Sequence, residues 1–200
     1  MTVISEIKNF YSEDTRLGIV DFLENDLHLY ETKKTDDYNP ANKGNNRSCW
    51  TDLPFFAGEH QRLTDLVEQV FDESLRPTYT CLSCYDSDTG ILGIHVDRDQ
   101  CYRTVSYMIR CDGALNWPLY VGKWEVTDEE YEALQAHTSD FQAAPKKSYA
   151  INKILEAQEW ATIEHPTNSA AFFSGTHRWH YRDKIPAGTA DVIMFHYNPA

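Results

Sequence analysis

The spacing of apolar residues changes along the chain and divides it into a helical part and a strand-rich part. Before position 76, apolar residues recur at intervals of three and four, the spacing of an amphipathic helix. One such stretch covers 3–23. It fits either amphipathic helices or a helix that enters a strand, and we expect most of it to be helical. A second helix is predicted over 58–75. Its apolar side comprises Leu63, Leu66, Val67, Val70 and Phe71. The polar stretch 32–47 has the turn residues of a loop.

Short runs of β-branched, aromatic and cysteine residues follow Pro77 and indicate strands. These runs cover 79–85, 93–96, 103–110, 118–121, 170–173 and 191–197. They fall into two groups, because 122–169 contains two helical patterns, a capping box at 127–130 and helical spacing over 149–160. This insert is predicted either to cover a site as a lid or to pack as a helical excursion without a catalytic part.

Helices followed by two groups of short strands predict an α+β fold whose core is a double-stranded β-helix, a jelly-roll or cupin-like barrel. N-terminal helices would support this core, and the helical insert would interrupt it. The 200 residues fit a single domain, 1–200, with mainly helical support over 1–76 and a jelly-roll core over 77–200 that carries the insert at about 122–169. The mouth of such a barrel can hold a metal ion and a small cosubstrate.

Charge and composition exclude several partners. The formal net charge is −13, and no basic cluster offsets it, so neither nucleic acid nor an anionic membrane surface is expected as a partner. No apolar run reaches the roughly 20 residues of a membrane span, and the first residues lack a signal-peptide pattern, so a cytoplasmic protein is expected.

The five cysteines, including Cys81 and Cys84 of a C-x-x-C pair, are expected to be reduced thiols.

The strongest chemical signal is the H-V-D motif at 95–97. On an extended strand residues i and i+2 point to the same face, so His95 and Asp97 could bind one ion. Asp99 has the same parity and is a rival carboxylate. A third ligand is available at His177 or His180. Two histidines and one carboxylate on one face of an octahedron leave three adjacent positions open, which is typical of non-haem iron(II) sites. The other histidines are expected at the surface (His28, His60, His137, His165) or facing core or cleft (His196).

The residues around this motif resemble a known family. Tyr85 follows a cysteine and lies ten residues before His95, and Arg103 lies eight residues after it. Hypoxia-inducible-factor prolyl hydroxylases, in the prolyl 4-hydroxylase-like branch of the Fe(II)/2-oxoglutarate-dependent oxygenases, share both spacings. The chain is still more similar to small, mostly uncharacterised members that carry four ordered motifs. Here these are H-V-D-R-D-Q-C at 95–101, W-P-L at 117–119, Gly175 with H-Y-R at 180–182, and F-H-Y at 195–197, so that the resemblance covers about 78–197.

The resemblance implies a ligand set for iron. It places the distal histidine at His180, several residues after an apolar strand and a turn, so that His95, Asp97 and His180 would bind the ion and His177 would be a surface or supporting residue. Relatives that halogenate lack the carboxylate, so the presence of Asp97 implies hydroxylation or a related oxidation. Arg103 is expected to form a structural ion pair.

The resemblance also implies where 2-oxoglutarate would bind. Tyr85 would form a hydrogen bond with 2-oxoglutarate, and the far carboxylate of 2-oxoglutarate would need a buried cation. Many relatives supply that cation nine or ten residues after the distal histidine, where this chain has Thr189 and Ala190. Thr189 is therefore expected among the residues that bind the cosubstrate, but it cannot supply the cation. Arg110 is therefore the first candidate, on a strand face expected to include Thr104, Ser106 and Met108, and Arg182 is its competitor.

By this resemblance the chain is an oxidoreductase, a 2-oxoglutarate-dependent non-haem iron dioxygenase. Its cofactors would be Fe(II), 2-oxoglutarate and dioxygen, with ascorbate as an optional supporting reductant. It would hydroxylate an unactivated C–H bond of an amino acid, a peptide or protein side chain, or a small metabolite, and release succinate and carbon dioxide. The alternatives are a cupin-type metalloenzyme that does not use 2-oxoglutarate and a non-catalytic β-sandwich binding module.

Overall fold

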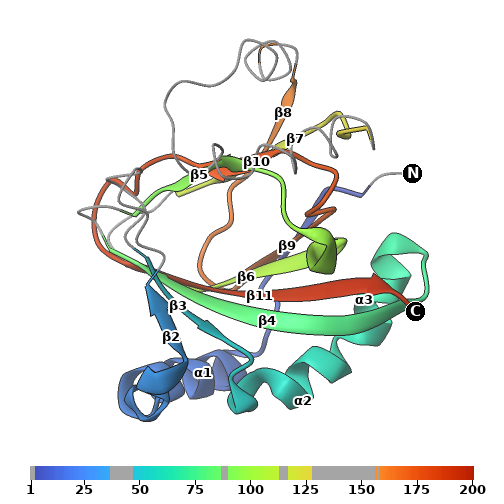
Figure 1. The fold of residues 1–200 in the computed structure, drawn as a ribbon. Coiled ribbons are helices and arrows are strands. Elements are labelled where there is room, and N and C mark those ends of the chain that lie inside the picture. Colours follow the sequence, from blue (N-terminus) through green and yellow to red (C-terminus); the bar gives the residue numbers. More distant parts are fainter. Residues whose placement is uncertain (1–2, 37–46, 87–89, 113–116, 128–155, 157) are drawn as a thin grey trace.

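Two antiparallel sheets face each other in the computed structural model, which describes residues 3–36, 47–86, 90–112, 117–127, 156 and 158–200 (Figure 1). Within these residues the larger sheet has the strand order β1-β9-β6-β11-β4-β3-β2, and the smaller sheet has the order β5-β10-β7-β8. The strands of the larger sheet are β1 (Ser5–Lys8), β2 (Lys34–Asp36), β3 (Arg47–Thr51), β4 (Leu75–Tyr85), β6 (Arg103–Cys111), β9 (Ser169–Phe173) and β11 (Ala190–Pro199). Those of the smaller sheet are β5 (Leu92–His95), β7 (Leu119–Gly122), β8 (Trp160–Ile163) and β10 (His180–Arg182).

Three helices cover the outer face of the larger sheet (Figure 1). They are α1 (Glu13–Asn25), α2 (Pro54–Arg62) and α3 (Thr64–Phe71), and a 3-10 segment (Leu27–Lys33) follows the first. Ser12 caps α1 by accepting a hydrogen bond from the backbone N–H of Thr15 at 3.2 Å. Asp72, in the left-handed region with φ of 55°, ends α3.

The alternation of side chains along β11 shows how the larger sheet separates two interiors. Ile193 and Phe195 pack into the apolar cluster beneath the helices. Val192 belongs to a second cluster on the opposite face, together with Met108 and Trp117. The same period of two along β6 and β4 directs one set of side chains to the helices and the other into the space between the sheets. The inner set lines the site.

The predicted jelly-roll class and the six predicted strand runs are confirmed, each run lying within a few residues of an observed strand. The prediction for the opening segment was partly wrong, because Ser5–Lys8 forms an edge strand on β9 before α1 begins. The helix predicted over 58–75 is two helices, and β4 already begins at Leu75. The expected loop 32–47 contains β2 and the start of β3.

Most of the predicted insert lies outside the described residues, including the capping box after Thr127 and most of the helix predicted over 149–160. Its last predicted residue, Trp160, begins β8, which pairs with β7. None of the five cysteines forms a disulfide in the structure, which agrees with the expected reduced thiols. No helix in the described part of the chain is long and apolar enough to span a membrane.

Candidate metal centre

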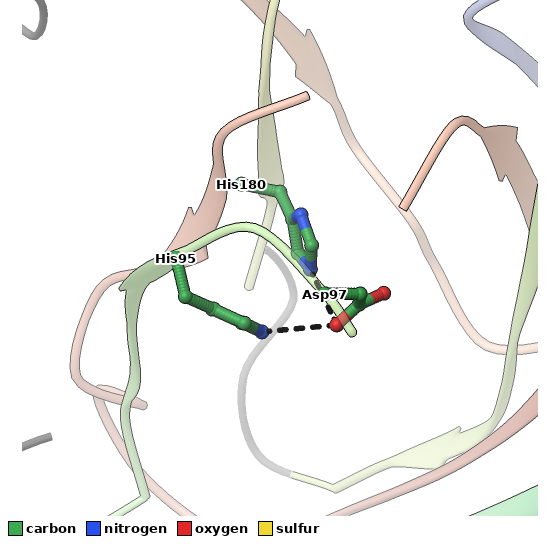
Figure 2. Close-up of side chains that lie close together, drawn as sticks. All are labelled: His95, Asp97 and His180. Atoms are coloured by element: carbon green, nitrogen blue, oxygen red, sulfur yellow. Dashed lines mark ion pairs between the residues drawn. The ribbon is translucent and has the colours of Figure 1, made fainter. Parts of the chain in front are cut away.

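The smaller sheet brings together two histidines that are far apart in the sequence. His95 ends β5 and His180 begins β10, and these two residues are direct partners in the antiparallel pairing. Asp97 follows two residues after His95, and its backbone N–H donates to the carbonyl of Gly175 at 2.9 Å. That bond joins the segment after β5 to the turn before β10. The carboxylate therefore faces both imidazoles (Figure 2).

The three side chains present ligand atoms at the spacing that one ion needs. Oδ1 of Asp97 lies 3.4 Å from Nε2 of His95 and 3.6 Å from Nε2 of His180. The ligand atoms of this group all lie within 4.8 Å of one another. Two donors that are each about 2.1 Å from an ion and at right angles lie about 3 Å apart, so small rotations would close the set around a metal.

Both imidazoles are oriented so that Nε2 is the ring nitrogen available to bind a metal ion. Nδ1 of His95 lies 2.7 Å from the carbonyl of Gly93, and Nδ1 of His180 lies 2.9 Å from the carbonyl of Arg178. Because a carbonyl only accepts, each Nδ1 carries a proton, and Nε2 is the nitrogen that faces Asp97 and that a metal ion would use. Metal-binding histidines are usually oriented in this way by a backbone or carboxylate acceptor. The residues present therefore fit a divalent ion.

Burial and charge favour the unprotonated state that a metal requires. Burial and the neighbouring His180 lower the pKa of His95. Burial alone would raise the pKa of Asp97, but the charge and hydrogen bonds of His180 and His95 hold it well below its usual range. The side chain of His180 is 4% exposed and that of His95 is 31% exposed, so the site opens to solvent on the His95 side.

The rival ligands lie elsewhere. Nδ1 of His177 is 2.6 Å from the hydroxyl of Thr176, and its ring lies edge-on to Tyr102. Asp99 is exposed in the 3-10 turn Asp99–Cys101. Neither belongs to a potential ligand group among the described residues.

The surface assignment of two histidines was wrong. His60 is buried and bonds to the carbonyl of His196, and His165 is almost fully buried between the sheets. His28 is exposed as expected, and His196 faces the interior; His137 lies outside the described residues. Nothing in the sequence around His165 distinguishes it from a surface histidine, because its burial depends on the distant strands that cover it.

The predicted face of Arg110 was also wrong, because β6 contains a bulge. Met108 pairs with Val192 but Arg110 pairs with Asp191, so β6 has one residue more than β11 at this point. The extra residue turns Arg110 to the helix side, where it bonds to Asp191 at 2.5 Å and to Glu24 of α1 at 2.6 Å. A cation held by two carboxylates on the outer face is not available to a ligand between the sheets.

Arg182 occupies the interior in its place. It follows His180 by two residues on β10 and is 2% exposed. Its guanidinium lies over the ring of Trp117 at 4.7 Å, donates to the carbonyl of Trp117 at 2.6 Å, and bonds to Nδ1 of His165. Burial lowers the pKa of Arg182 to about 10. No ion pair links it to a carboxylate among the described residues, which is unusual for a buried cation.

The other predicted cosubstrate residues divide between the interior and the surface. Tyr85 is buried on the inner face, with its ring edge-on to Trp117 and its hydroxyl accepting from Arg47 at 3.0 Å. Thr189 is exposed and bonds to Asp112 at the end of the sheet. The expected structural ion pair of Arg103 is present, since its guanidinium binds both carboxylate oxygens of Glu73. Tyr85 and Arg182 thus remain as inner-face candidates.

Comparisons with known proteins identify solved structures with the same architecture. No protein-family model and no curated protein sequence matches the chain. The non-haem α-ketoglutarate-dependent carbocyclase SnoK from nogalamycin biosynthesis is similar to it with a TM-score of 0.76 and 10% identity, over 100% of this chain and 80% of that one. HygX from Streptomyces hygroscopicus, solved with nickel, 2-oxoglutarate and hygromycin B, is similar to the chain with a TM-score of 0.62 and 13% sequence identity. The match covers 100% of this chain and 84% of HygX.

A prolyl-4-hydroxylase from Pseudomonas putida gives a TM-score of 0.60 and 9% identity, over 100% of this chain and 94% of that one. At these identities the likeness shows the fold. The chain therefore has the jelly-roll fold of these 2-oxoglutarate enzymes, with its histidine and carboxylate cluster between the sheets.

Proposed function

We propose that the chain is an Fe(II)- and 2-oxoglutarate-dependent oxygenase whose ion is bound by His95, Asp97 and His180. The observation that carries the proposal is the convergence of two Nε2 atoms and one carboxylate oxygen, with both imidazoles oriented by backbone carbonyls. Three ligands on one side of an ion leave room for a chelating cosubstrate and dioxygen. The shared fold with SnoK and HygX supports the same assignment.

Hydroxylation is the reaction that the ligand set favours. When bound, ferrous iron and 2-oxoglutarate supply the oxidising chemistry that attacks an unactivated C–H bond and yields succinate and carbon dioxide. Asp97 occupies the ligand position that a halide would need. Its low pKa keeps it an anionic ligand at neutral pH.

Arg182 is the proposed partner of the far carboxylate of 2-oxoglutarate. On β10, His180 and Arg182 point inward, whereas Tyr181 between them stacks on Tyr120 on the other face. The same strand thus carries one proposed ligand of the ion and one buried cation, about 6.6 Å apart along the strand. This spacing suits a short dicarboxylate that binds the ion at one end. The guanidinium uses two of its five N–H groups on Trp117 and His165.

The proposed substrate is a small molecule that enters on the exposed His95 side. The HygX structure, which shares the fold, contains hygromycin B. A small metabolite or free amino acid fits this proposal better than a folded protein partner.

Metal binding and turnover test the proposal separately. Calorimetric titration of the metal-free protein with Mn(II) should give one tight site that His95→Ala or His180→Ala removes and that His177→Ala leaves unchanged. With Fe(II), 2-oxoglutarate and air, the protein should release succinate slowly even without its substrate. Tight metal binding with no succinate would favour the cupin-type enzyme, and no binding of Mn(II) or Fe(II) would favour a binding module.

A further inference from the structure

A second group of potential metal ligands lies beside the first and shares Asp97 with it. Its other members are Cys101, at the end of the 3-10 turn after the H-V-D motif, and His196, on the inner face of β11. The three ligand atoms lie within 4.8 Å of one another. Cys101 is 1% exposed and His196 is 3% exposed. Cysteine sulfur, histidine nitrogen and aspartate oxygen are each ligands that zinc accepts.

The hydrogen bonds of His196 orient it as those of a metal-binding imidazole do. The hydroxyl of Thr104 donates to the carbonyl of Cys101 at 3.4 Å, so its oxygen is the acceptor for Nδ1–H of His196 at 3.1 Å. Nε2 of His196 is then the nitrogen with the lone pair. Burial lowers the pKa of His196 to about 4, so the ring is neutral near pH 7. Thr104 thus plays the part that Gly93 and Arg178 play for the first two histidines.

Asp97 can serve both groups because its two oxygens face different surroundings. Oδ1 is the atom that lies near the two imidazoles of the first group. Oδ2 packs against Gly175, where an added Cβ would overlap it and would stand 2.5 Å from the carbonyl of Cys101 and 2.7 Å from the hydroxyl of Thr104. A carboxylate that belongs to two ligand groups can bridge two ions about 3.5–4 Å apart, as in two-metal sites.

The thiol of Cys101 also has a partner suited to its ionised form. The hydroxyl of Tyr79 lies 3.0 Å from Sγ and can donate to a thiolate, and the guanidinium of Arg98 lies over the Tyr79 ring at 5.3 Å. Zinc-bound cysteine is a thiolate whose proton is released when the ion binds. Without an ion, burial and the charge of Asp97 raise the pKa of Cys101 to about 12 although Tyr79 and Arg98 oppose the rise, so the thiolate forms only when a cation binds.

We propose that Asp97, Cys101 and His196 form a second cation site, selective for a soft divalent ion such as Zn²⁺ and distinct from the two-histidine site that shares Asp97. Ion binding replaces the Cys101 proton, which leaves to solvent. The thiolate separates the two sites chemically, since sulfur favours zinc and the histidine–carboxylate set suits iron. A second ion this close repels the first, so Zn²⁺ in this site should weaken retention of iron.

Cobalt reports directly on a thiolate ligand. The metal-free protein would be titrated with Co²⁺ while the near-ultraviolet charge-transfer band from thiolate to cobalt is recorded. The band should be present in the wild type and in Cys84→Ser, which removes a thiol on the helix side of β4. It should be absent in Cys101→Ser. His196→Asn should weaken the Co²⁺ affinity measured from the band by about tenfold or more.

A double variant, His95→Ala with His180→Ala, distinguishes this proposal from the proposed function. The band should persist in it, because the second site keeps Cys101 and His196, whereas succinate release should be lost. A band that survives in Cys101→Ser, or the lack of any band in a wild type that binds Co²⁺, would overturn the second site and leave the oxygenase proposal intact. Circular dichroism and thermal unfolding of each variant would show that it is folded.

Discussion

Replacing Arg182 with Met tests the proposed cosubstrate site most directly. Met has a similar length and removes the charge from a guanidinium that is 2% exposed and has no ion pair with a carboxylate in the described chain. Burial lowers the pKa of Arg182 by more than two units from the usual arginine value, to about 10. Since a unit of pKa corresponds to about 1.4 kcal/mol, carrying this charge costs the fold about 3 kcal/mol.

The variant should therefore fold well but bind 2-oxoglutarate poorly. Loss of the hydrogen bonds to Trp117 and His165 offsets much of the relief from the buried charge, so the unfolding free energy without ligand should change by no more than about 1–2 kcal/mol. A bidentate pair with a carboxylate contributes two charge-assisted hydrogen bonds of about 1.5–2 kcal/mol each. Its loss should raise the Kd for 2-oxoglutarate roughly 10²–10³-fold.

The assay is anaerobic calorimetry of 2-oxoglutarate binding to the Mn(II)-loaded protein, with urea unfolding as the check on stability. Arg110→Met is the matched control. It breaks the ion pairs with Glu24 and Asp191 and should lower stability while leaving the Kd for 2-oxoglutarate unchanged. An unchanged Kd in Arg182→Met, or a large rise in the control, would refute the assignment of Arg182.

Two further variants test the packing around the site. Gly175→Ala would place a Cβ against Oδ2 of Asp97; the carboxylate must move, and the Mn(II) affinity should fall by about 10–100-fold, whereas an unchanged titration would contradict this reasoning. Burial and the charge of Arg182 lower the pKa of His165 well below 6.5. The unfolded chain then binds one proton more below pH 6.5, so this group's contribution to stability is complete above pH 6.5 and is lost as pH falls, at up to about 1.4 kcal/mol per pH unit. Asparagine tolerates the left-handed backbone at position 165. The variant His165→Asn should therefore flatten the pH dependence of the unfolding free energy, measured with urea on the metal-free protein between pH 6.5 and 5. An unaltered slope would show that His165 is not buried as a neutral ring.

Local periodicity predicted the strands and the two-residue parity of His95 and Asp97, because both depend on neighbouring residues. It failed at Arg110, because a bulge adds one residue and reverses every later side chain. The bulge depends on how β6 pairs with β11, so it cannot be predicted from the sequence of β6 alone. The edge strand Ser5–Lys8 was missed for a related reason, since its apolar residues also fit a helix.

Only those residues of the site that belong to a sequence motif could be predicted. His180 and His177 are equivalent by spacing alone, and the resemblance separated them. Long-range packing could not be read from the chain: the overlap of Gly175 with Asp97, Cys101 and Thr104 involves three segments that meet only in the fold. The burial of His165 beside Arg182 depends on the same meeting of distant strands.

The fold suggests a physical reason why this chain has Ala190 where many members of the family that its motifs resemble have a basic residue. Ala190 is fully buried on the inner face of β11, in the cluster that contains Trp117, the residue on which Arg182 stacks. A basic side chain at 190 would compete with Arg182 for the space beside Trp117, so a small residue at one position makes room for the guanidinium at the other. The cation of a 2-oxoglutarate site could thus come from β10 or from β11, which belong to the two facing sheets. Arg182→Ala combined with Ala190→Arg should then regain at least about tenfold of the 2-oxoglutarate affinity that Arg182→Ala loses, as measured by the same calorimetry. If the double variant folds and binds no better than Arg182→Ala, the two positions do not share one carboxylate site.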